Sequence, residues 1–145
     1  MKVLIDNRQK KYKISLKKIQ QKAKAILSAL DCPNGELSIL IVDDAQIEPL
    51  NRKYLGRQGA TNVIAFPMHT GQFSNIQPEL LGDVVISIET AANESVIAGI
   101  STEKRLSQLL IHGILHLLGY DHERTGQEAK IMEQKSDDIL KLIET

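Results

Sequence analysis

The sequence predicts one layered domain of the α/β or α+β class that spans residues 1–145. Short apolar runs alternate along the chain with longer stretches in which apolar residues recur every three or four positions. This alternation is typical of strands and helices packed in layers around one core. A length of 145 residues, with 42% apolar and 25% charged residues, is sufficient for such a core and excludes a disordered or fibrous chain.

The first half of the chain predicts two strands and two helices. Residues 3–5 form a short apolar run that predicts a strand, and a helix is predicted at 15–30 because Ser15 is a favoured N-cap. Residues 32–35, with the sequence Cys-Pro-Asn-Gly, predict a turn. Residues 37–42 are apolar throughout, which predicts a strand buried on both faces, and the helix predicted at 43–54 begins with two aspartates.

The second half predicts two more strands and three helices. Strands are expected at 62–66 and 84–88, separated by a loop that contains prolines and glycine. A helix over 89–98 ends at a glycine, and a longer one begins after the capping Ser101 and ends near Gly119. An amphipathic helix is expected over 125–143.

The charge of the chain gives no strong indication of a partner. Eighteen basic and eighteen acidic residues cancel, and three Tyr, two Phe and no Trp leave little material for a surface on which bases stack. Basic residues are concentrated in residues 1–24, which contain a single acidic residue, Asp6. This segment is either an electrostatic footprint for phosphates or a solvated helix face rich in lysine.

The sequence predicts a cytoplasmic protein that does not associate with membranes. A single cysteine cannot form an internal disulfide, which favours a reducing compartment. No apolar run approaches the roughly 18 to 20 residues of a membrane-spanning helix. The apolar stretch near the N-terminus is too short for a signal peptide.

Histidines at three positions predict a metal centre at the end of a central helix. His112 and His116 are four residues apart within a predicted helix, so their side chains share one face. Gly119 allows the chain to leave the helix sharply, and His122 can then fold back as a third ligand. Three imidazoles suit Zn²⁺ or another divalent ion and leave a fourth position open, as in catalytic zinc sites.

The residues beside these histidines indicate which side chains could act as a general base at the metal site. The spacing of the three histidines is that of metzincin-type zinc peptidases, which place a glutamate directly after the first histidine as general base. Gly113 occupies that position here and has no side chain. Asp121 either orients an imidazole or accepts a proton through water, or it simply completes the turn before His122. The general base is therefore left open.

The block from His112 to His122, His-Gly-Ile-Leu-His-Leu-Leu-Gly-Tyr-Asp-His, closely resembles the signature of the YbeY family of bacterial metal-dependent endoribonucleases. Further blocks resemble the family in the same order along the chain: Leu50-Asn51, Tyr54, Thr61-Asn62-Val63, Phe66-Pro67 and Leu81-Gly82-Asp83-Val84-Val85-Ile86. The resemblance covers roughly residues 37–140.

The resemblance implies an α+β fold with a small mixed sheet of about four strands packed with helices. It also implies an endoribonuclease that cuts single-stranded RNA, matures the 3′ end of the small-subunit ribosomal RNA and helps to clear defective ribosomes. The ligands of one Zn²⁺ ion would be His112, His116 and His122, and the partners would be ribosomal RNA and the ribosome.

One departure from the family pattern concerns the RNA-facing residues. The family has an arginine directly after the tyrosine of its Asn-x-x-Tyr-Arg stretch, and Leu55 stands there in this chain. Arg57 and Arg52 are the candidates to contact phosphate instead. Two alternatives to the endoribonuclease are kept. Leu55 favours a non-catalytic zinc-binding ribosome-assembly factor, and the spacing of the three histidines leaves a zinc peptidase, which Gly113 disfavours.

Overall fold

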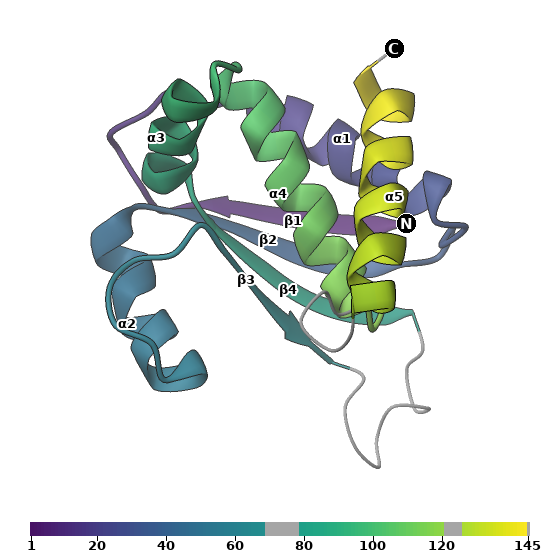
Figure 1. The fold of residues 1–145 in the computed structure, drawn as a ribbon, viewed down its shortest axis with the longest axis horizontal. Coiled ribbons are helices and arrows are strands. Elements are labelled where there is room, and N and C mark those ends of the chain that lie inside the picture. Colours follow the sequence, from purple (N-terminus) through teal and green to yellow (C-terminus); the bar gives the residue numbers. More distant parts are fainter. Residues whose placement is uncertain (69–78, 121–125, 145) are drawn as a thin grey trace.

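A computed structural model describes residues 1–68, 79–120 and 126–144 of the chain (Figure 1). The strands of the described part are β1 (Lys2–Asn7), β2 (Glu36–Val42), β3 (Val63–Pro67) and β4 (Leu80–Ser87). They form one four-stranded sheet in the order β1-β2-β4-β3, so that β1 and β3 are its edges. The β1–β2 and β2–β4 pairs are parallel, whereas β3 runs antiparallel to β4. The expected mixed sheet of an α+β fold is confirmed.

Helices cover both faces of this sheet (Figure 1). They are α1 (Leu16–Ala29), α2 (Asp44–Leu55), α3 (Ile88–Ala98), α4 (Thr102–Leu117) and α5 (Gly126–Glu144). Helices α1, α4 and α5 pack together in the larger core, with α3 against α4, while α2 packs on the opposite face. No helix in the described ranges is long and apolar enough to cross a membrane.

Strand β2 contributes to both cores, as its sequence predicts. Leu37, Ile39 and Ile41 pack into the larger core, and Val42 packs with α2 in the smaller one. Strand β4 alternates in the same way, because Val84 faces the larger core and Val85 the smaller one. The continuous apolar runs of these two central strands therefore follow from burial on both sides.

The predicted helix starts are confirmed at the atomic level. Ser15, Asp43 and Ser101 are N-caps whose side-chain oxygens accept hydrogen bonds from the backbone N–H three residues on, at 3.2, 2.9 and 3.0 Å. Asp43 also forms a capping box with Gln46. Gly99 adopts the left-handed conformation after α3, as predicted from its position.

The main difference from the prediction lies in β4, which begins at Leu80 rather than at residue 84. Pairing with β2 extends the strand, since Leu80 lies opposite Glu36 in the register. Gly82 has a φ of 136°, and a β-carbon there would clash with the Phe66 carbonyl oxygen of β3. The strand also ends one residue early, because Ser87 is the N-cap of α3 and Ile88 is already helical.

Candidate metal centre

His112 and His116 lie one turn apart near the C-terminal end of α4 and direct their imidazole rings toward each other. Their Nε2 atoms are 3.0 Å apart, and the rings meet edge to face with centroids separated by 4.6 Å. Both side chains are partly buried. The prediction that the two histidines share one face of a helix is confirmed.

This pair fits the donor set of a zinc-type ion. Two nitrogens bound to one tetrahedral ion at about 2.0–2.1 Å are about 3.3 Å apart. The observed separation of 3.0 Å between the Nε2 atoms needs only a small opening to reach that value. The same distance also suits a hydrogen bond between two neutral imidazoles of suitable tautomers.

The third predicted ligand, His122, and its neighbour Asp121 lie outside the described residues. Within residues 1–68, 79–120 and 126–144, no group of three or more His, Cys, Asp or Glu side chains is placed to hold a metal ion. His122 therefore remains a prediction, and so does the zinc ion.

Gly113 has a packing reason for lacking a side chain. A β-carbon at this position would lie 2.7 Å from Cγ1 of Val84 and 3.3 Å from Cγ2 of Val63. Helix α4 thus lies directly on the sheet at the turn that carries both histidines. A glutamate after His112, which the peptidase alternative requires, does not fit there.

A cleft of about 450 Å³ runs along the histidine pair between α4 and β3. Its α4 side is formed by His112, Gly113 and His116. The opposite side is formed by β3 and the residues just before it, namely residues 61–65 and Pro67. Leu55, the last residue of α2, and Arg57, in the segment after α2, complete this side. The structure therefore places the predicted Arg57 in the same cleft as the predicted metal ligands.

The segment that carries Arg57 is anchored by a buried side chain of α2. Asn51 is only 2% exposed, and its Nδ2 donates a hydrogen bond of 2.9 Å to the carbonyl oxygen of Gly59. The Arg57 N–H donates to the carbonyl oxygen of Asn51 at 3.3 Å. Gly56 and Gly59 both have positive φ values, which permit the tight path of this segment.

Arg52, the other candidate cation, has a different setting. Its Nη1 donates to the Glu48 carboxylate at 3.0 Å, across one turn of α2. Both side chains are largely exposed. The structure thus brings Arg57, but not Arg52, to the histidine cleft.

Comparison with known proteins identifies the family. A family model described as endoribonuclease YbeY matches residues 4–144. The chain belongs to the YbeY family. The match extends beyond the residues 37–140 expected from the motifs and includes most of β1 and all of α1.

The chain is similar to curated members of the YbeY family over nearly its whole length. Endoribonuclease YbeY of Geobacter sulfurreducens is 49% identical over 145 residues, which cover 99% of this chain and 97% of the relative. The protein of the same name from Aquifex aeolicus is 42% identical, covering 90% of this chain and 85% of the relative. The solution structure of TM1509 from Thermotoga maritima aligns with a TM-score of 0.67 over 97% of this chain and 88% of that chain. At 22% identity that likeness concerns the fold alone.

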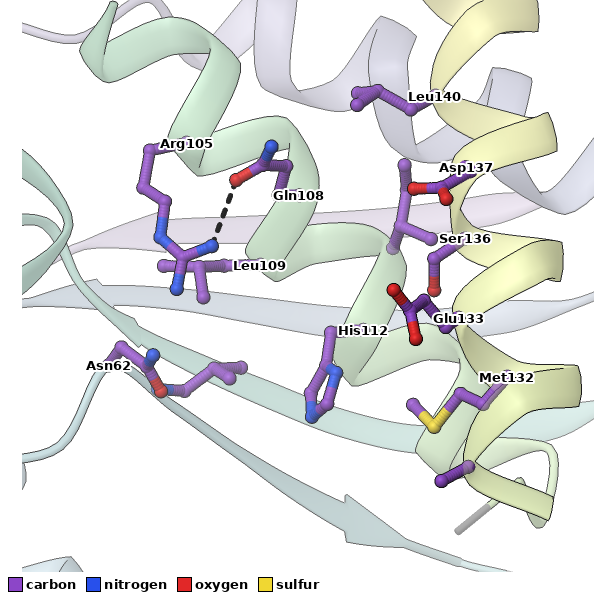
Figure 2. A pocket seen from close by; sticks show the side chains of 13 residues that line it. Asn62, Arg105, Gln108, Leu109, His112, Met132, Glu133, Ser136, Asp137 and Leu140 are labelled. Carbon is purple, nitrogen blue, oxygen red and sulfur yellow. Dashed lines mark hydrogen bonds between the residues drawn. The ribbon is translucent and has the colours of Figure 1, made fainter. Parts of the chain in front are cut away.

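A polar network beside the YbeY histidines was not predicted from the sequence. Glu94 accepts hydrogen bonds from Asn62 Nδ2 at 3.3 Å and from Arg105 Nε at 3.1 Å. Arg105 Nη1 also donates to Gln108 Oε1 at 2.9 Å, the hydrogen bond drawn in Figure 2. Arg105, Gln108 and His112 are spaced three and four residues apart in α4, and this helical spacing was a signal available in the sequence.

Proposed function

We propose that this chain is a single-strand-specific, zinc-dependent endoribonuclease that acts in the cytoplasm in maturation of the small-subunit ribosomal RNA 3′ end and in ribosome quality control. The observation that supports this most is the convergence of His112 and His116 on the wall of a cleft that also holds Arg57. The names of the curated relatives support the same class of reaction.

In the proposed enzyme His112, His116 and His122 hold one Zn²⁺ ion. When bound, zinc supplies polarisation of a phosphoryl oxygen and activation of a water molecule. Arg57 contributes a cationic guanidinium that binds a phosphate of the substrate in the same cleft. The proton acceptor is not assigned, because Gly113 supplies none and Asp121 lies outside the described residues.

The dimensions of the cleft favour single-stranded RNA. A volume of about 450 Å³ is in the range of small-ligand pockets, so the cleft accommodates a short strand segment rather than a duplex. One side of the cleft is the edge β-strand β3 and the other is helix α4, so a single strand of RNA can pass between them. The ribosomal RNA would be reached where it is unpaired.

The test compares cleavage of labelled single-stranded and duplex RNA by zinc-loaded protein, with and without a chelator. We expect cleavage of the single strand that the chelator stops, slower cleavage of the duplex, and no cleavage by a His112→Ala protein purified in the same way. Metal content is measured on both proteins. Equal cleavage by parent and His112→Ala would assign the activity to a contaminant and contradict the proposal.

The non-catalytic assembly factor remains a second candidate because of one observation. Leu55 lies in the cleft beside Arg57, at the position where the resemblance implies an arginine. Leu55→Arg adds a donor for phosphate within this cleft and should raise the rate of single-strand cleavage. A zinc-loaded Leu55→Arg protein that still fails to cleave RNA would favour the assembly factor.

A further inference from the structure

A second cavity, of about 500 Å³, adjoins the histidine cleft on the other side of His112. It lies between α4 and α5, and we call it the α4–α5 cavity (Figure 2). Asn62, Val63 and His112 line both this cavity and the histidine cleft. An RNA strand that places a phosphate at His112 therefore has its neighbouring nucleotide within reach of the α4–α5 cavity.

The α4 side of this cavity carries a hydrogen-bond donor held in place by neighbours. The Arg105 guanidinium is paired with the Glu94 carboxylate at 3.1 Å, so its charge is already compensated. Its Nη1 donates to Gln108 Oε1, which fixes the amide and leaves Gln108 Nε2 as the donor end of that side chain (Figure 2). This wall provides an oriented neutral donor rather than a free cation.

The α5 side of the cavity carries acceptors. Glu133 and Asp137 extend from α5 toward α4, with Ser136 between them (Figure 2). No salt bridge or hydrogen bond to another described residue engages either carboxylate. Two carboxylates repel a phosphate, so this side of the cavity favours a group that bears hydrogen-bond donors and no negative charge.

Between the two polar walls the lining is apolar. Leu109 and Met132 are buried, and Leu140 and Val63 are partly buried. Flat apolar surface flanked by oriented polar groups is typical of pockets for small aromatic ligands. A nucleobase has this combination of an apolar face and a polar edge.

We propose that the α4–α5 cavity binds the nucleobase next to the phosphate at His112 and selects bases with an exocyclic amino group over uracil. The inference rests on the proposed function for the identity of the polymer. Cytosine presents the N4 amino group as a donor to the carboxylates, and its ring carbonyl accepts from Gln108. Uracil presents a carbonyl oxygen, O4, where cytosine has the amino group, and that oxygen faces the carboxylates unfavourably.

The test uses two RNA hexamers, hexacytidylate and hexauridylate, which differ only in that edge of the base. Dissociation constants are measured by fluorescence anisotropy on the full-length chain with chelator present, so that no cleavage interferes. We expect the parent to bind hexacytidylate about tenfold more tightly, in keeping with one hydrogen bond to a charged group. The Glu133→Gln/Asp137→Asn double variant should bind both hexamers with similar affinity.

A matched control is available on the same helix. Asp138 is exposed and accepts a hydrogen bond from Gln134 Nε2 at 3.0 Å, outside the cavity, so Asp138→Asn removes one charge from α5 without altering the lining. It should preserve the tenfold preference. An equal affinity of the parent for both hexamers, or a preference unchanged in the double variant, would overturn the inference.

The outcome separates this inference from the proposed function. A preference for hexacytidylate in binding, together with no cleavage by the zinc-loaded parent, supports the base site and contradicts the endoribonuclease. Cleavage of both hexamers by the zinc-loaded parent without any preference in binding supports the endoribonuclease and contradicts the base site.

Discussion

Gly113 of α4 lies so close to Val84 of β4 that a β-carbon on the glycine would come within 2.7 Å of the valine Cγ1. Gly113→Ala should therefore lower the free energy of unfolding by about 1–3 kcal/mol, even though alanine favours helix more than glycine does. Urea unfolding followed by circular dichroism measures the loss.

A control and a rescue make this prediction specific. Gly126, at the start of α5, has open space where a β-carbon would lie, so Gly126→Ala should be neutral or slightly stabilising. Val84→Ala should make the Gly113→Ala change less costly in a double-mutant cycle. Purely additive effects of the two substitutions would show that the close approach does not limit packing.

Removal of one imidazole should abolish the stabilisation of the folded chain by added zinc. At free zinc 100-fold above the dissociation constant, the parent should gain about 2.7 kcal/mol, visible as a higher Tm. His116→Ala should show little gain at the same zinc concentration and should carry much less zinc by atomic absorption. His69→Ala, which alters the histidine outside the predicted ligand set, should keep the gain. Full zinc occupancy in His116→Ala would exclude the three-histidine site.

Loss of the cleft arginine should reduce cleavage without loss of metal. Arg57→Ala removes a charged hydrogen bond to phosphate worth on the order of 1.5–3 kcal/mol, so single-strand cleavage should fall roughly ten- to a hundredfold. Arg52→Ala, which breaks only the exposed pair with Glu48, should change the rate far less. The comparison is decided by initial rates at equal zinc content. A larger loss in Arg52→Ala would assign the phosphate contact to Arg52.

The single cysteine should react slowly in the folded protein. Partial burial, assisted by the neighbouring Asp31, raises the pKa of the Cys32 thiol. A raised pKa lowers the thiolate fraction at pH 8, and only the thiolate is alkylated rapidly. Iodoacetamide should therefore modify Cys32 several-fold faster in the urea-unfolded chain than in the folded one. Equal rates in the two states would contradict the protected thiol.

The raised pKa of Cys32 also makes the free energy of unfolding depend on pH. Because the folded-state pKa of Cys32 is raised, the folded chain holds the proton more tightly than the unfolded chain does. The corresponding contribution to stability is present below the pKa of the unfolded thiol and is lost as the pH rises through the folded-state value. Cys32→Ser should remove this dependence at alkaline pH.

Local signals in the sequence predicted most of the fold. Ser15, Asp43 and Ser101 cap their helices through hydrogen bonds to residues only three positions away, so a short window of sequence contains the whole interaction. The start of β4 was wrong by four residues because it depends on the register with β2, which is more than forty residues distant in the chain. Non-local pairing of this kind leaves no local signature.

In the candidate site, too, local features were predictable from the sequence, and features that depend on distant elements were not. The spacing of His112 and His116 was sufficient to predict that their side chains meet. The reason for Gly113 was not predictable, because it depends on Val84 of another element. The α4–α5 cavity was missed for a similar reason, since Glu133 and Asp137 reach it only through the packing of α5 beside α4.

The position of β3 at the edge of the sheet has a consequence for self-association. The hydrogen bonds from Ser87 to Asn62 and from Met68 to Leu81 show that Val63, Ala65 and Pro67 direct their backbone groups away from β4. Proline has no N–H, and the Val63 N–H already donates to Asn62 Oδ1 at 2.7 Å. Ala65 alone among these three offers a donor, so the edge is a poor template for strand addition by another chain. The edge strand that forms one wall of the cleft therefore resists pairing with a β-strand of a second copy of the chain.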